Sequence, residues 1–93
     1  MKNVLVTGCS KGIGFQIVKQ FAKQSDTRVL AISRDSVGLN KLAQECKLIN
    51  KHFVLKVMSL DLSVMSSIEA LAKIVQTDFN SSVDGIIHNA GFL

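Results

Sequence analysis

Three of the chain's six glycines fall within seven residues, in the stretch Gly8-Cys9-Ser10-Lys11-Gly12-Ile13-Gly14. One residue, Thr7, separates this stretch from the apolar run Val4–Val6, which predicts a buried strand over residues 2–7. Apolar residues then recur at helical spacing and predict an amphipathic helix from about residue 12 to residue 24. The expected buried face of this helix consists of Ile13, Ile17, Val18 and Phe21. A buried strand therefore passes into a helix through a glycine-rich turn.

Strand and helix patterns alternate along the rest of the chain. Continuous apolar runs predict three more strands, over residues 28–33, 53–60 and 83–88. Two helices are predicted between them, the first capped by Asp35 or Ser36 and the second by Ser63. Their apolar stripes are Leu39, Leu42, Ala43 and Cys46, and then Met65, Ile68, Leu71, Ala72, Val75 and Phe79. The order β-α-β-α-β-α-β predicts an α/β fold whose parallel sheet is covered by helices on both faces.

The composition excludes several classes of function. The net charge is +4, but the lysines and arginines are scattered and the only aromatic residues are five phenylalanines, so nucleic-acid binding is not expected. No apolar run approaches the roughly 20 residues that span a bilayer, so no membrane partner is expected either. Cys9 and Cys46 form no metal-binding pattern, and we expect no metal site.

The two cysteines are expected to be reduced packing residues of a cytoplasmic protein. Cys9 has an alternative interpretation, because it lies in the glycine stretch just before a helix. A helix N-terminus lowers a thiol pKa, so Cys9 is also a candidate reactive thiol.

A glycine-rich turn between a strand and a helix suits a phosphate group. The first N–H groups of a helix have no partner within the helix, and the helix end carries a partial positive charge. Glycine permits the tight turn and lets the backbone approach a pyrophosphate without an intervening Cβ atom. Taken by itself, the spacing Gly-x-x-x-Gly-x-Gly is equally compatible with an ordinary tight turn.

Three segments together resemble motifs of the short-chain dehydrogenase/reductase family. They are TGCSKGIG at residues 7–14, SLDLS at residues 59–63 and HNAG at residues 88–91. The resemblance covers the whole chain, with the motifs in the family's order. It implies a Rossmann-type, doubly wound parallel sheet with strand order 3-2-1-4, cut off after the fourth strand. The first two helices are then expected on one face and the third on the other.

The resemblance also implies roles for individual residues. Gly8, Gly12 and Gly14 would form the pyrophosphate turn, with the N–H of Ile13 nearby. Asp61 would accept a hydrogen bond from the adenine amino group, and the N–H of Leu62 would face the ring. The adenosine ribose would be lined by Asn89, Ala90 and Gly91. His88 replaces the family's first asparagine, and we interpret it as a strand-end residue rather than a catalyst.

The end of the second strand indicates which dinucleotide would bind. An acidic residue there would bind the ribose 2′-hydroxyl of NAD, whereas an arginine accommodates the 2′-phosphate of NADP. In this chain Ser33 takes the acidic position and Arg34 follows it. Lys11 adds a second cation, and Ser10 can donate a hydroxyl hydrogen bond. The expected cofactor is therefore NADP(H).

The resemblance does not extend to catalysis. In the family, a Tyr, a Lys four residues later and a Ser carry out the proton transfer, and they follow the fourth strand. This chain contains no tyrosine, so we assign it no catalytic residue. We expect residues 1–93 to be a fragment, the N-terminal portion of a dinucleotide-binding domain from a reductase that is homo-oligomeric when full-length. The alternative is a stand-alone nucleotide-binding or interaction module without catalysis.

Overall fold

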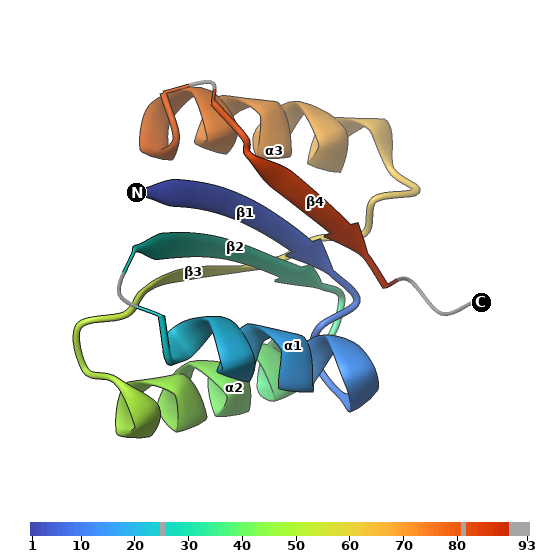
Figure 1. Ribbon diagram of the computed structural model, residues 1–93. Helices are drawn as coiled ribbons and strands as arrows, with labels where there is room; N and C mark the ends of the chain where they lie inside the picture. Colours follow the sequence, from blue (N-terminus) through green and yellow to red (C-terminus); the bar gives the residue numbers. More distant parts are fainter. Residues whose placement is uncertain (25, 81, 90–93) are drawn as a thin grey trace.

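The computed structural model describes residues 1–24, 26–80 and 82–89, and every predicted strand and helix is present among them (Figure 1). Observed strand bounds differ from the predicted ones by at most two residues. In chain order the elements are β1 Lys2–Thr7, α1 Gly12–Ala22, β2 Thr27–Ser33, α2 Ser36–Ile49, β3 Val54–Ser59, α3 Met65–Asp78 and β4 Gly85–His88.

The four strands form one parallel sheet in the order β3-β2-β1-β4, which confirms the predicted topology. The last residue of β1, Thr7, lies opposite Ile32 of β2 and His88 of β4. Ser33, which ends β2, lies opposite Ser59 of β3. All four strands therefore end at the same edge of the sheet, and the segments that follow them are neighbours in space.

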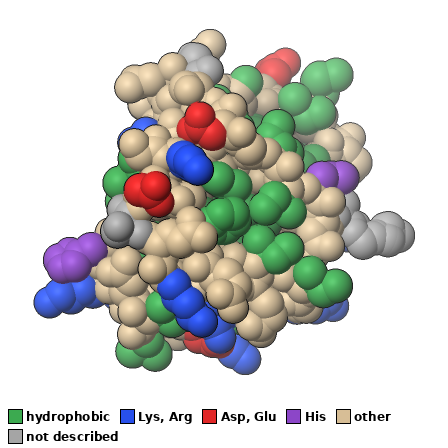
Figure 2. Space-filling model, in the orientation of Figure 1, with side chains coloured by type: hydrophobic (Ala, Val, Ile, Leu, Met, Phe, Trp, Pro, Cys, Tyr) green, Lys and Arg blue, Asp and Glu red, His purple; other side chains and the backbone are tan. Residues whose placement is uncertain are grey.

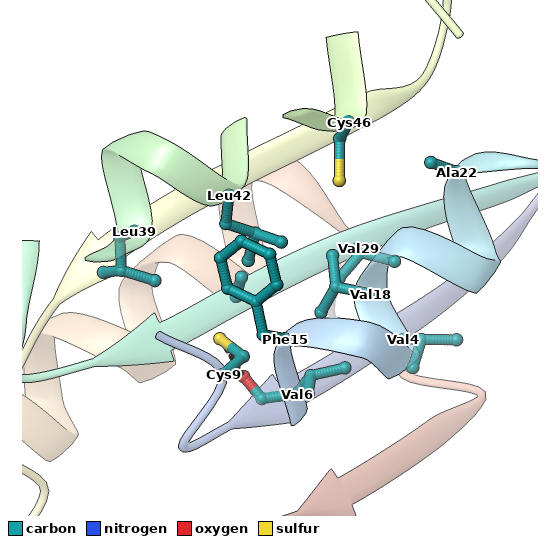
Figure 3. Close-up of a cluster of buried hydrophobic side chains, with 11 residues drawn as sticks. Val4, Val6, Cys9, Phe15, Val18, Ala22, Val29, Leu39, Leu42 and Cys46 are labelled. Atoms are coloured by element: carbon teal, nitrogen blue, oxygen red, sulfur yellow. Dashed lines mark hydrogen bonds between the residues drawn. The ribbon is translucent and has the colours of Figure 1, made fainter. Parts of the chain in front are cut away.

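Helices cover both faces of the sheet, as predicted. Helices α1 and α2 lie on one face and α3 on the other (Figure 1). The larger core is the one beneath α1 and α2, where Phe15, Val18 and Leu42 pack against Val6 and Val29 of the sheet (Figure 3). Leu5, Leu30 and Ile32 point to the opposite face and pack with Phe79, at the end of α3. Alternate residues of β1 and β2 thus serve two cores, because successive side chains of a strand point to opposite faces.

The outer elements are less buried than their apolar sequences predicted. Among the described strands, β3 and β4 each have one neighbour, and every residue of these two strands is either exposed or half-buried. No residue of α3 is fully buried, and Met65 of its predicted stripe is 69% exposed. Leu71 and Val75 of that stripe do pack against the sheet, together with Ile74, which was not predicted. The apolar stripe of α3 is wider than the surface on which the helix rests.

Two local predictions at helix starts had different outcomes. Asp35 is the N-cap of α2, as predicted, and its carboxylate accepts a hydrogen bond from the Gly38 N–H at 3.1 Å. Ser63 does not cap α3. The N-cap is Val64, and the Ser63 hydroxyl donates to Asp61 at 2.6 Å instead. Hydrogen bonds to charged groups are stronger than those between neutral groups. The Ser63 hydroxyl therefore bonds to the Asp61 carboxylate rather than to the N-terminus of α3.

The surface over β4 is rich in apolar side chains. Figure 2 shows them gathered on the face of the molecule where β4 runs between the two helix layers. Ile86 lies opposite Leu5 in the sheet, hence on the α3 face, and is 65% exposed. None of the helices in the described part of the chain is long and apolar enough to cross a membrane.

Two leucines of α2 differ sharply in burial, which predicts different losses of stability when each is truncated. Replacing the fully buried Leu42 with Ala should reduce the free energy of unfolding by about 2–5 kcal/mol, because the substitution leaves a cavity. Leu48 lies on the same helix but is 87% exposed, so Leu48→Ala should change that free energy by no more than about 0.5 kcal/mol. Urea denaturation followed by circular dichroism measures both. Equal losses in the two variants would contradict the placement of α2.

Candidate functional site

A cleft of about 770 Å³ lies at the edge of the sheet where the strands end. In doubly wound sheets, ligands bind beyond the carboxyl ends of the strands, at the point where the strand order reverses. Here that point lies between β1 and β4. The cleft is lined by Thr7, Gly8, Ser10, Lys11, Gly12, Ile13, Ile32, Ser33, Arg34, Leu60, Asp61, Leu62, Ser63, His88 and Asn89.

The cleft brings together the predicted site residues from all three motifs. Gly14 is the one described member of the predicted set that does not line it. Ala90 and Gly91 lie outside the described residues. Five lining residues were not in the predicted set: Thr7, Ile32, Leu60, Ser63 and His88, the last of which was interpreted only as a strand-end residue. Their positions in the sequence could have identified them, because each of them lies at or just beyond the end of a predicted strand.

Gly8 and Gly12 provide the backbone conformation of the loop. Their φ angles are 63° and 68°, in the left-handed region that side chains other than glycine rarely adopt. A Cβ atom built on Gly12 would meet nothing within 4 Å. Gly12 is therefore required for its conformation, and the space in front of it is open to a ligand.

Gly14 is required for packing. A Cβ atom there would lie 2.6 Å from the Gly8 carbonyl oxygen and 2.8 Å from the Asn89 side-chain nitrogen. The same Asn89 nitrogen donates a hydrogen bond to the Gly8 carbonyl at 3.3 Å, and the Asn89 N–H donates to the Thr7 carbonyl at 3.3 Å. The first turn of α1, the glycine loop and the end of β4 therefore meet at a single carbonyl group.

The N-terminus of α1 opens on the cleft without a side-chain cap. Its N-cap residue is Lys11, whose side chain makes no capping hydrogen bond, and the first turn contains no acidic residue. The first N–H groups of a helix then need an external acceptor, and the helix dipole favours an anionic one. This end of α1 has the chemistry of a phosphate site.

A pair of serines connects the glycine loop to the end of β2. The Ser33 hydroxyl donates to the Ser10 hydroxyl at 2.9 Å and accepts from the Asp35 N–H at 3.3 Å. Helix α2 approaches this pair closely, since a Cβ atom on Gly38 would lie 2.6 Å from the Ser10 carbonyl oxygen. Sequence reasoning missed Gly38, because a glycine within a helix carries no sign of what lies against it.

The charged side chains of the cleft are accessible to solvent. Arg34 and Lys11 are both exposed. The hydroxyl and then the backbone N–H of Ser63, at 2.6 and 3.0 Å, lower the pKa of Asp61, and the charge of Arg34 adds a smaller effect in the same direction. Asp61 is therefore ionised at neutral pH and acts only as an acceptor.

The remaining titratable candidates have structural roles. The His88 ring nitrogen Nδ1 lies 2.7 Å from the Thr7 hydroxyl, so the strand-end histidine is held against β1. Cys9 is fully buried in the core beneath α1 and α2 (Figure 3). Burial raises the pKa of its thiol to about 11, so the thiol stays protonated at neutral pH. Cys9 is therefore better interpreted as a packing residue than as a reactive thiol. Across residues 1–24, 26–80 and 82–89, no group of three or more His, Cys, Asp or Glu side chains could hold a metal ion.

The fold and the cleft define a Rossmann-type domain with a glycine-rich turn at the start of its first helix. The comparisons with known proteins agree with this class. The family model for short chain dehydrogenase matches residues 2–93. The chain belongs to the short-chain dehydrogenase family.

Individual relatives cover nearly all of the chain. The benzil reductase ((S)-benzoin forming) of Saccharomyces cerevisiae is 36% identical over 99% of the chain and 34% of its own length. The (-)-isopiperitenone reductase of Mentha piperita is 32% identical over 94% of the chain and 28% of its own length. The chain therefore spans about a third of the length of these relatives.

Solved structures show the same fold. The menthone neomenthol reductase from Mentha piperita superposes with a TM-score of 0.84 at 31% identity, over 98% of this chain and 32% of that one. The L-sorbose reductase from Gluconobacter frateurii, solved with NADPH and L-sorbose, superposes with a TM-score of 0.83 at 25% identity over 98% of this chain and 34% of that one. Members of the family bind nicotinamide dinucleotides.

Gly14 and Gly85 have different surroundings, so replacing each with alanine should affect stability differently. Gly14→Ala forces a Cβ atom against the Gly8 carbonyl, so we expect a loss of about 1–3 kcal/mol in the free energy of unfolding. Gly85 has ordinary φ and open space around its Cβ position, so Gly85→Ala should be neutral or stabilise by up to about 1 kcal/mol. Thermal and urea denaturation compare the two. A Gly14→Ala variant as stable as the unaltered chain would contradict the close contact.

Proposed function

We propose that residues 1–93 form the NADP(H)-binding part of a short-chain reductase, which transfers hydride between NADPH and a carbonyl or alcohol substrate. The observation that carries this proposal is the arrangement at the end of β2. A serine pair and an exposed arginine occupy the place where an acidic residue would bind the 2′-hydroxyl of NAD.

The nearest acid supports the same preference. Asp35 follows Arg34 directly, but its carboxylate caps α2 through the Gly38 N–H. A carboxylate that already accepts a hydrogen bond from a helix N–H is less available to accept one from a ribose hydroxyl. The planar guanidinium of Arg34 suits a phosphate, and Lys11 adds a second positive charge at the same cleft.

The residues of the cleft fit the rest of a dinucleotide. We assign the pyrophosphate to the uncapped N-terminus of α1, where Gly8 and Gly12 take left-handed conformations and Gly12 leaves its Cβ position open. Asp61 is an ionised acceptor and is assigned to the adenine amino group, with the Leu62 N–H facing the ring. Asn89, with Ala90 and Gly91, is assigned to the adenosine ribose, and Ile13 and Gly14 to the first turn beneath the pyrophosphate.

A bound nicotinamide would supply the hydride, and the protein would have to supply the proton. Stabilising a developing alkoxide requires a proton donor near the operating pH and an oriented hydrogen-bond donor. We assign neither role within these 93 residues. His88 is the histidine that lines the cleft, and its Nδ1 atom lies 2.7 Å from the Thr7 hydroxyl.

The relatives suggest the substrate class and the setting of the whole protein. Similar proteins include, by name, a bulky-bulky ketone specific alcohol dehydrogenase, a benzil reductase and a menthone neomenthol reductase, so we propose a ketone as the substrate of the complete enzyme. Both described cysteines are free thiols, which suits a reducing compartment such as the cytoplasm. We expect the complete enzyme to be a homo-oligomer.

The cofactor assignment predicts a preference that depends on Arg34. The unaltered chain should bind NADPH more tightly than NADH, as measured by titration calorimetry. Arg34→Ala should remove most of that preference, because a hydrogen bond to a charged group contributes about 1.5–3 kcal/mol, or at least about tenfold in affinity. Lys73→Ala removes the same charge from the exposed side of α3 and should leave the preference unchanged. Equal affinity of the unaltered chain for both cofactors would refute the assignment.

The division of roles predicts binding without turnover. With NADPH and a panel of ketones and aldehydes, the 93-residue chain should show no sustained loss of NADPH absorbance. The His88→Ala variant should behave identically. Sustained turnover that disappears in His88→Ala would show that the chemistry resides in this chain and that the proposed division is wrong.

A further inference from the structure

A second pocket lies at the end of the sheet opposite the cleft. It measures about 300 Å³ and opens where β2 and β3 begin, beneath the end of α3. Among the described residues, none lines both this pocket and the cleft. Its walls are mostly apolar and carry three charged side chains: the lining residues are Arg28, Val29, Leu30, Val54, Lys56, Ile74, Asp78 and Phe79.

Arg28 is held in place at this pocket. Its Nε donates to the Asn3 side-chain oxygen at 2.8 Å, and its guanidinium lies 5.5 Å from the centre of the Phe79 ring. Asn3 is only 4% exposed, and its Nδ2 donates to the carbonyl groups of Ser82, at 2.9 Å, and Phe79, at 3.4 Å. The hydrogen bond through Nε and the ring below it orient the guanidinium before any ligand binds.

The other charges leave this guanidinium uncompensated. Lys56 pairs with Asp78 at 2.9 Å, so these two lining charges neutralise each other. Asp84, the acid attached to the same network, accepts from the Asn3 backbone N–H at 2.8 Å. Among the described residues, no carboxylate forms an ion pair with Arg28. The pocket therefore combines one net positive charge with apolar walls.

We infer that this pocket binds a small organic carboxylate with an apolar or aromatic body. Arginine presents a planar fork that matches a carboxylate, and within the described part of the chain only the Nε of the Arg28 guanidinium makes a hydrogen bond. Leu30, Ile74 and Phe79 surround the space in which the apolar body would lie. The volume lies at the lower end of the range for small-molecule sites, which suits a molecule of the size of benzoate.

Benzoate is the probe for this site, and benzamide is its neutral control of the same shape. The backbone amide signals of the isotope-labelled 93-residue chain should shift saturably with benzoate at Arg28, Leu30 and Phe79, with a dissociation constant in the millimolar range. Benzamide should cause much smaller shifts. Absence of saturable shifts, an equal response to benzamide, or shifts confined to the cleft would overturn the proposal.

Variants separate the guanidinium from the overall charge of the protein. Arg28→Met should weaken benzoate binding by at least about tenfold, and Arg28→Lys, which keeps the charge but not the fork, should also weaken it. Lys73→Met removes an exposed charge from α3 and should leave benzoate affinity unchanged. If Arg28→Met does not fold, the comparison of benzoate with benzamide on the unaltered chain decides the question by itself. Unchanged affinity in a folded Arg28→Met variant would contradict the assignment.

Discussion

The contact between Gly14 and the Gly8 carbonyl group is the constraint on which the cleft depends. Helix α1 can begin this close to the end of β1 only because no Cβ atom stands between them. The same carbonyl accepts the Asn89 side chain, so the end of β4 is attached to the same point. The uncapped helix N-terminus, the glycine loop and the β4 edge are thus held in one arrangement before any ligand arrives. A phosphate would meet preorganised donors, so little ordering would oppose its binding.

The two ends of the sheet have different chemistry. At the carboxyl ends of the strands, a helix N-terminus, Arg34 and Lys11 surround a wide cleft that is open to solvent. At the amino ends, Arg28 is oriented by Asn3 and Phe79 beside a smaller, mostly apolar pocket. Helix α3 contributes to this second pocket with its last turn, although none of its residues is fully buried. The least buried helix of the fold therefore covers the pocket that we assign to a carboxylate ligand.

The sequence predicted those features that follow from local pattern. The apolar runs of β1 and β2 and the Asp35 cap are recognisable in the sequence and are confirmed by the structure. Most of the described motif residues at the strand ends line the cleft, and their roles stay predictions. Helical spacing predicted that Ile13 would be buried, but its side chain is 72% exposed. The reason is that the first turn of α1 projects beyond the sheet toward the cleft. Likewise, nothing local distinguishes Gly38 from a tolerated helix glycine, since its close neighbour, Ser10, lies far away in the sequence. Exposure on α3 and β4 also depends on what lies beside them, which no periodicity records.

The central claim is that the cleft at the carboxyl ends of the strands is the dinucleotide site. The most direct measurement is a titration of the isotope-labelled chain with NADPH, followed through its backbone amide signals. Saturable shifts should concentrate at the loop from Gly8 to Gly14, at Ser33 and Arg34, and at Leu62, and leave the pocket around Arg28 unaffected. Shifts confined to other surfaces, or no saturable shift at any cofactor concentration, would contradict the account.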